Sequence, residues 1–335
     1  MRTILLITIA TFIISCESKV EELQVLQGNA FGTTYTIQYF TDDFFDAEKG
    51  IDSVIYSVNK SVSTYMPNSD ISKINKGDST VVVDEIFREV FRLSEEIHKQ
   101  SNGYFDPTIG VLRNAYGFGD VKPLKKIDSL TLDSLLNFVG FQKVTLASDN
   151  HISKELPQIY FDFNAVAKGY GIDKIGEFLE SKGVRHYVIE LGGEILAKGE
   201  NLQKDQAWTS GIEAIDSAIG NRSYEAVVRL NNEAMAASGN YRKFRIDSAT
   251  GKKYVHTINP LTGLAEESDV TSATVIANTC AAADAYATTF MALGLSKSKA
   301  LLNNLSGIEA YLTFNDSLGN NLVYTTKGFE DRLKN

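Results

Sequence analysis

Cysteine is nearly absent from this sequence. Its 335 residues contain only Cys16 and Cys280. If a leader is cleaved before Cys16, the mature chain keeps Cys280 as its one other cysteine, and a lone cysteine cannot form an intrachain disulfide. A disulfide framework is therefore excluded, and stability has to come from a hydrophobic core. The length is sufficient for one large domain or two ordinary ones.

Basic side chains are outnumbered by acidic ones. The chain has 33 Lys and Arg residues against 42 Asp and Glu residues, a formal net charge of −9 at pH 7. Nucleic-acid binding requires clustered Lys and Arg at the phosphates, so this balance argues against a nucleic-acid partner. A phosphorylated small ligand stays compatible with it, because backbone N–H groups and a metal ion can hold phosphates.

The apolar run at the amino terminus is short. It covers residues 4–14 and is interrupted by Thr8 and Thr11, whereas a membrane span needs roughly 18 residues. Together with Arg2, the run is typical of a secretory signal peptide, and the segment IISC that ends at Cys16 resembles a lipobox. An ordinary signal peptide with a chance cysteine is the alternative. We expect a lipoprotein signal peptide over residues 1–15, lipidation of Cys16, a linker over residues 16–22 and a domain over residues 23–330.

Hydrophobic periodicity predicts an α+β protein. Alternation of Tyr35, Ile37 and Tyr39 with polar residues predicts a strand, and Ile51, Val54, Ile55 and Val58 have helical spacing. No internal repeat or interdomain linker is evident, so a single domain is the simplest architecture. The further expected elements are helices at 84–101, 165–179 and about 281–293, a strand at 187–191, several short strands at 208–276, and a final helix followed by two strands that end near residue 324.

A histidine lies before a sharp turn in residues 254–263, YVHTINPLTG. Asn-Pro and Thr-Gly both favour turns, so His256 is expected at the end of a strand, where it can face a cleft. A single histidine is more often structural, and the segment alone leaves both interpretations open.

A carboxylate and a hydroxyl share a face of the predicted helix at 281–293. Asp284 and Thr288 are four residues apart, and their neighbours are mostly alanine. Such a pair is suited to a hard cation. The alternative is an aspartate favoured only by the helix dipole.

Two further segments suggest a phosphorylated, planar ligand. Asp162 ends a strand, and Lys168 lies near the start of the next helix, where free N–H groups attract phosphate; a capped helix with a solvent-facing lysine is the alternative. Tyr104 and Phe105 follow Gly103, and aromatics alternate with glycines in the segment YGFG at 116–119. Aromatic rings beside glycine can enclose a planar ring. The same pattern is more often a turn with core aromatics.

In their order, these segments resemble the ApbE family of FAD:protein FMN transferases. The resemblance covers residues 31–294 and includes a single helix motif with Asp284 and Thr288. The other motifs are STYMPNSD from Ser63, FDPTIG from Phe105, AKGY from Ala167, LGGE from Leu191, SGNY from Ser238 and HTINPLTG from His256. It implies one ApbE-like, T-fold-related α+β domain with mixed or antiparallel sheets and packed helices.

The resemblance also implies site residues. By position, the family's cation ligands match Asp284, Thr288 and the carbonyl of Ala165, with the carbonyl of Ala287 as a further candidate, and the cation is usually Mg²⁺. His256 matches the histidine that helps to activate the acceptor hydroxyl, with Asp284 as the other candidate base. The family's flavin contacts match Phe31, Tyr65, Tyr104, Phe105, Asp106, Asp162, Lys168 and Ile258.

The implied reaction is Mg²⁺-dependent transfer of FMN from FAD to a threonine hydroxyl of an acceptor protein, with release of AMP. The implied acceptor is a subunit of an envelope redox complex of the Nqr or Rnf type. The enzyme itself is expected to be lipid-anchored in the bacterial envelope and to face the periplasm. An FAD pyrophosphatase that releases FMN and AMP, and a flavin-binding lipoprotein without turnover, are the alternatives.

Overall fold

The computed structural model describes residues 21–214, 223–240, 244–246, 251 and 253–334. The predicted signal peptide and Cys16 lie outside these residues, as does Tyr241 of the SGNY motif. The predicted linker over 16–22 meets a strand that begins at Glu22. No helix in the described part of the chain combines the length and apolar character needed to cross a bilayer.

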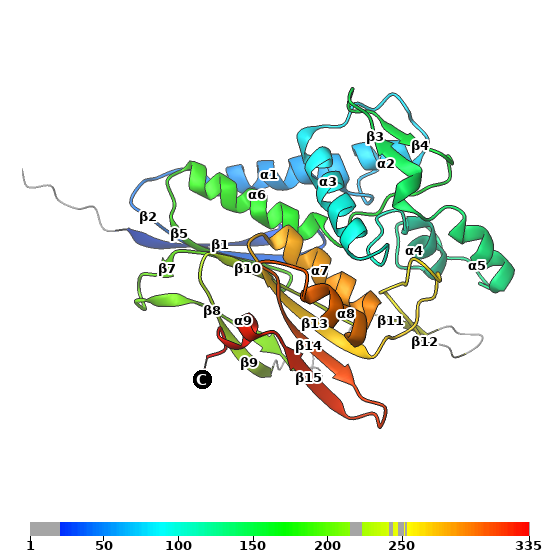
Figure 1. Cartoon of the computed structure of the whole chain (residues 1–335). Coiled ribbons are helices and arrows are strands. Elements are labelled where there is room, and N and C mark those ends of the chain that lie inside the picture. The colour runs from blue at the N-terminus through cyan, green and yellow to red at the C-terminus, as the bar shows by residue number, and fades with distance from the viewer. Residues whose placement is uncertain (1–20, 215–222, 241–243, 247–250, 252, 335) are drawn as a thin grey trace, which may run out of the picture.

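An eight-stranded sheet forms the centre of the fold (Figure 1). Each strand is antiparallel to its neighbours. Since only antiparallel pairs occur in it, the sheet agrees with the predicted α+β class. Its strands, in spatial order, are β1 (Glu22–Ala30), β2 (Thr33–Thr41), β5 (His186–Leu191), β6 (Glu194–Lys198), β10 (Glu233–Gly239), β13 (Val270–Ala277), β14 (Glu309–Asn315) and β15 (Asn321–Thr325).

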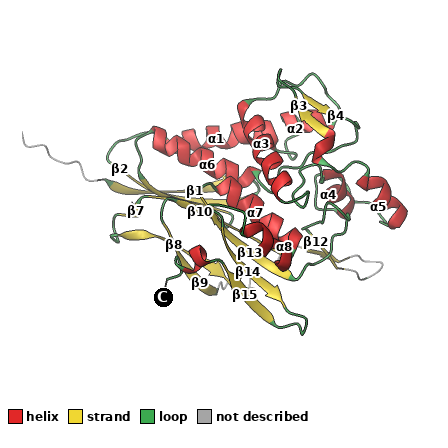
Figure 2. Cartoon of the chain, in the orientation of Figure 1, coloured by secondary structure: helices red, strands yellow, loops and turns green. Residues whose placement is uncertain are grey.

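Helices cover one face of this sheet (Figure 2). The apolar faces of α1 and α6 bury Ile51 and Ile172 against Ile37 of β2 and Ile189 of β5. The helix α7 packs on β10 and β13, beside α6. The helices of the chain are α1 (Ala47–Val62), α2 (Asp70–Asn75), α3 (Glu85–Gln100), α4 (Gly110–Tyr116), α5 (Ser129–Leu136), the 3-10 turn Phe141–Lys143, α6 (Ala167–Ser181), α7 (Cys280–Leu293), α8 (Leu295–Leu302) and α9 (Lys327–Glu330).

The opposite face carries a small sheet and α9 (Figure 1). Trp208, Phe40 and Phe329 belong to one buried cluster between these elements and the central sheet. The result is three layers with the large sheet in the middle, an arrangement that buries both sheet faces. The remaining strands are β7 (Glu200–Asn201), β8 (Gln206–Glu213) and β9 (Tyr224–Leu230) of the small sheet, and the pairs β3 (Val144–Leu146) with β4 (Ile152–Lys154) and β11 (Phe244–Ile246) with β12 (Lys253–Val255).

The predicted elements form where the periodicity placed them, within a few residues. The side chain of Asp84 accepts a hydrogen bond from the N–H of Phe87 at 2.9 Å, so it is the N-cap of α3 that the sequence predicts. The strand β2 buries Tyr35, Ile37 and Tyr39 on one face, as the alternation requires. The strand β1 was not anticipated, nor were the short elements α2, α4, α5, α9, β3, β4, β6 and β7.

Candidate functional site

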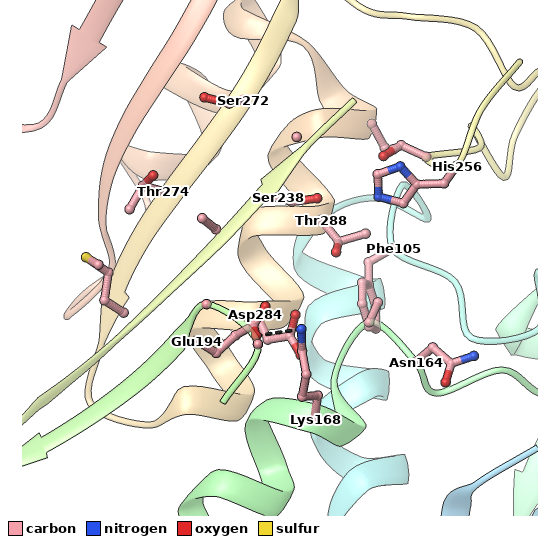
Figure 3. Close-up of a pocket in the computed structure, with 18 of the residues that line it drawn as sticks. Phe105, Asn164, Lys168, Glu194, Ser238, His256, Ser272, Thr274, Asp284 and Thr288 are labelled. Carbon is pink, nitrogen blue, oxygen red and sulfur yellow. Dashed lines mark ion pairs between the residues drawn. The ribbon is translucent and has the colours of Figure 1, made fainter. Parts of the chain in front are cut away.

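A cavity of about 560 Å³ lies beside the start of α6, one face of α7 and strands β6, β10 and β13 (Figure 3). Small-molecule sites have volumes of about 300–1,000 Å³, so the cavity is in the range of a cofactor-sized ligand. The motifs that begin at Phe105, Ala167, Leu191, Ser238 and His256 contribute to the lining, together with the α7 pair. Ten predicted site residues line it: Tyr104, Phe105, Asp106, Asp162, Ala165, Lys168, His256, Ile258, Asp284 and Thr288.

The start of α7 is fixed by an aspartate from the neighbouring helix. The carboxylate of Asp173 in α6 accepts the N–H of Cys280 at 2.7 Å and the N–H of Ala281 at 2.9 Å. The hydroxyl of Thr279 accepts the N–H of Ala282 at 3.3 Å as the N-cap. These bonds satisfy three of the free N–H groups at this helix end and lock α7 against α6.

Close approach of the two helices depends on Gly169. A Cβ atom at this position would lie 2.3 Å from the carbonyl oxygen of Cys280 and 2.8 Å from the nitrogen of Ala281. In the resulting contact, the N–H of Gly169 donates to Oδ2 of Asp284 at 3.2 Å. The glycine and the alanines of α7 therefore hold the Asp284 carboxylate at the start of α6.

Three charged groups gather there, two buried carboxylates and the partly exposed side chain of Lys168 (Figure 3). Lys168 Nζ lies 2.5 Å from Oε2 of Glu194, and Asp284 lies near both. Burial and the neighbouring Asp284 raise the pKa of Glu194 to about 8, and burial also raises the pKa of Asp284. Burial would lower the pKa of Lys168, but the two carboxylates outweigh it and raise that pKa. Two carboxylates face one ammonium, so the cluster carries an excess of negative charge or holds a proton.

The oxygen donors of this cluster suit a hard divalent cation. Asp284 and Thr288 lie one helical turn apart on α7, and both line the cavity with Ala165. Among the described residues, no three His, Cys, Asp or Glu side chains gather as a metal centre. A cation would therefore need hydroxyl and backbone carbonyl oxygens or water besides Asp284, a ligand set that suits Mg²⁺ and not Zn²⁺.

Another part of the lining is aromatic. Tyr104 and Phe105 contribute to it, and Lys297 Nζ lies 4.8 Å from the centre of the Tyr104 ring. Asp106 is buried and accepts hydrogen bonds from the N–H and hydroxyl of Thr108 and the N–H of Phe141. Its oxygens are therefore engaged in shaping the loop that carries the two aromatic rings.

Asp162 is held by an arginine that the sequence analysis did not select. Arg113 Nε lies 3.1 Å from Oδ2 of Asp162, and both side chains are largely buried at the cavity. The N–H of Asn164 donates to Oδ1 of Asp162 at 2.8 Å. Arg113 belongs to α4, 49 residues before Asp162, and no local pattern marks it as a site residue.

Three predicted residues lie outside the cavity lining. Phe31 has a positive φ of 51° in the turn between β1 and β2, and its ring occupies the space beside Gly171. Tyr65 is 60% exposed in the loop after α1, and Ala287 is buried within α7. Their proposed contacts stay predictions.

Glu194 is the second residue that the sequence analysis left out, although it had identified the LGGE segment. It begins β6 directly after the turn Gly192–Gly193, whose φ angles of 62° and 104° favour glycine. From the sequence, this segment contributes only a motif to the family resemblance. A glutamate that follows two glycines at the start of a buried strand was the available signal.

Sequence comparisons match most of the chain to a single family. The sequence model of the ApbE family matches residues 31–312. The FAD:protein FMN transferase of Haemophilus influenzae is 33% identical over 307 residues, which cover 88% of this chain and 87% of that protein. The protein of the same name from Vibrio cholerae is 32% identical, with 85% and 86% covered.

Solved structures match over the same extent. The flavin transferase ApbE from Vibrio cholerae superposes with a TM-score of 0.83 at 28% identity, covering 93% of this chain and 100% of that chain. The apo form of the flavinyl transferase ApbE from Pseudomonas stutzeri has a TM-score of 0.80 at 25% identity and covers 94% and 98%.

Proposed function

Because the chain belongs to the ApbE family, we propose that it is an FAD:protein FMN transferase. One observation carries this proposal: the charged cluster of Lys168, Glu194 and Asp284 lies in a cofactor-sized cavity that also has aromatic lining. FAD has one part that suits each feature: its phosphates are anionic and suit the charged cluster, and its flavin ring is planar and suits the aromatic lining. A binding site for this substrate needs both features in one cavity.

The phosphates of FAD fit best beside Lys168. Its ammonium lies near the start of α6, where the helix dipole adds to the positive potential. Tyr104 and Phe105 would face the flavin ring, which aromatic side chains hold by stacking. Asp162, fixed by Arg113, and the backbone of Ile258 would orient the same ligand.

We assign the divalent cation, Mg²⁺, to Asp284, Thr288 and the backbone carbonyl of Ala165, with Ala287 as a further carbonyl candidate. When bound, the cation neutralises charge that develops on the phosphates as the anhydride bond breaks. Asp284 is suited to this role because its carboxylate is buried and one oxygen is already oriented by the N–H of Gly169.

In the transfer step, a threonine hydroxyl of the acceptor attacks the phosphorus on the FMN side of FAD. The new bond joins the hydroxyl oxygen to phosphorus, the anhydride P–O bond breaks, and AMP leaves. His256 lines the cavity from the segment after β12 and would receive the hydroxyl proton. Asp284 is the weaker candidate base, since its carboxylate is needed for the cation. Lys168 would hold the phosphates in line for the attack.

The proposed setting is the bacterial envelope. The leader over residues 1–15 and the lipobox before Cys16 support a lipid anchor, with the domain facing the periplasm. An acceptor in this compartment would be a subunit of a membrane redox complex of the Nqr or Rnf type that exposes a threonine.

The test is intact-mass spectrometry of a candidate acceptor after incubation with this protein, FAD and Mg²⁺. A mass gain of one FMN is expected, and it should disappear when the acceptor threonine is replaced by alanine. Free FMN and AMP without acceptor modification would instead identify an FAD pyrophosphatase. Unchanged FAD beside an acceptor that another family member can modify would reduce the protein to a flavin-binding role.

A further inference from the structure

Glu194 belongs to the charged cluster but has no role of its own in the proposed reaction, yet it is among the most buried carboxylates of the described residues. The residue is 4% exposed and lines the cavity. Its position is set by the turn Gly192–Gly193, in which a Cβ at Gly192 would lie 2.6 Å from the side chain of Thr33. The backbone thus directs this carboxylate into the cluster, where desolvation makes it unfavourable unless a partner compensates for it.

Its compensating partner is Lys168. The two side chains form an ion pair with Nζ and Oε2 2.5 Å apart (Figure 3). Oε2 of Glu194 has no hydrogen-bond donor of suitable geometry among the described residues, so its compensation depends on the ammonium charge. Within the same part of the chain, Lys168 forms no ion pair with Asp284, although the charge of Asp284 raises the pKa of Lys168.

This choice of partner matters for Asp284. In a buried environment, an unpaired ammonium and a nearby carboxylate attract each other strongly. If Lys168 paired with Asp284, it would cover the oxygen that a cation needs and add a positive charge beside it. A second carboxylate that holds the ammonium prevents this pairing.

We propose that Glu194 is a positioning residue that holds the Lys168 ammonium away from Asp284, which keeps Asp284 available to the divalent cation and Lys168 available to phosphate. This inference rests on the proposed function, because it concerns the cation and phosphates of that same site. The elements involved are the β5–β6 turn, the start of α6 and the start of α7, brought together by the fold.

The first test is the variant Glu194→Gln, which keeps the shape of the side chain and removes its charge. Titration with Mn²⁺, followed by the loss of the free-ion EPR signal without FAD, reports cation binding independently of activity. We expect the dissociation constant to rise about tenfold or more. The matched control is Glu177→Gln, which removes an exposed glutamate that pairs with Lys174 at 2.9 Å, and it should leave the constant within about twofold.

The second test separates positioning from direct coordination. In the double variant Lys168→Met with Glu194→Gln, the competing ammonium is gone, so Mn²⁺ affinity should return to within about threefold of wild type. FMN transfer should stay low, because the phosphate contact is lost. A double variant as weak as Glu194→Gln alone would overturn the proposal and indicate that Glu194 is itself a cation ligand.

If Glu194→Gln does not fold, Lys168→Met alone still tests the proposal. It leaves two carboxylates without an ammonium, so Mn²⁺ should bind at least as tightly as in the wild type, and weaker binding would overturn the proposal. An unchanged Mn²⁺ dissociation constant in Glu194→Gln would also overturn it. Failure of the proposed function is recognised separately, since the wild-type protein would then bind Mn²⁺ and yet not modify any acceptor.

Discussion

Replacement of Gly169 by alanine is a severe test of the site, because the change is only one methyl group. The new Cβ would lie 2.3 Å from the carbonyl oxygen of Cys280, whereas ordinary contacts begin at 3.4 Å. Relief requires a shift of roughly 1 Å between α6 and α7, since the obstructing atoms belong to the backbone. The same shift would weaken the hydrogen bond from Gly169 to Asp284.

Two opposing effects determine the size of the change. Alanine in a helix is favoured over glycine by about 1 kcal/mol, while overpacking in a tight interior costs about 1–3 kcal/mol. The free energy of unfolding should therefore fall by on the order of 1–2 kcal/mol or less. The transfer rate should fall about 100-fold, because a displacement of about 1 Å moves Asp284 relative to Lys168 and the phosphates.

The assay is the initial rate of FMN transfer to the acceptor, measured by in-gel flavin fluorescence, beside thermal unfolding followed by circular dichroism. The control is Gly176→Ala on the same helix, where the nearest atoms to the new Cβ would be the side-chain ends of Leu196 and Tyr187 at 2.7 Å. Both side chains are buried, so this variant is also overpacked, but it makes no contact with Asp284 and should transfer FMN at close to the wild-type rate. A Gly169→Ala protein as active as this control would refute the link between helix contact and catalysis.

Other perturbations address the same region. Asp284→Ala should abolish transfer at saturating Mg²⁺ while the protein stays folded, and full activity would contradict the cation assignment. Asp173→Asn removes the charge that accepts the N–H groups of Cys280 and Ala281, so the free energy of unfolding should fall by about 3 kcal/mol in urea denaturation; an unchanged value would show that the start of α7 is held by other contacts. With EDTA present, the unfolding midpoint should decrease as the pH rises from about 5 to 8. Burial raises the pKa of both Glu194 and Asp284, so the folded cluster holds a proton that the unfolded chain has released. Since Glu194 is paired with Lys168, we place this proton on Asp284. Its stabilising contribution is present below the ordinary carboxyl pKa and is lost as the pH rises through the raised values, so Asp284→Asn should flatten the decrease.

Several elements of the fold could be predicted from local pattern. Alternation in β2, helical spacing in α1 and the Asp84 cap of α3 are short-range signals, and the structure confirms each of them. The strand β1 was harder to predict, because its residues alternate only between exposed and partly buried. Their partial burial follows from pairing with β2, and that pairing depends on the register of the whole sheet.

For the site, the sequence by itself determined which residue types are present and in what order. Motifs with His256, Lys168, Asp284 and Thr288 were sufficient to indicate the family, and all four line the cavity. This worked because each of these residues lies in a segment with its own turn or helix signal, which is visible over a few positions.

Only the tertiary structure decided how these groups pair. Arg113 holds Asp162, Glu194 holds Lys168 and Asp173 holds the start of α7, and each of these contacts joins segments 26 to 107 residues apart. The physical reason is that the pairing energy of buried charges depends on distance and desolvation, which appear only after the helices have packed on the sheet. Local sequence carries the donors and acceptors, and the fold determines their partners.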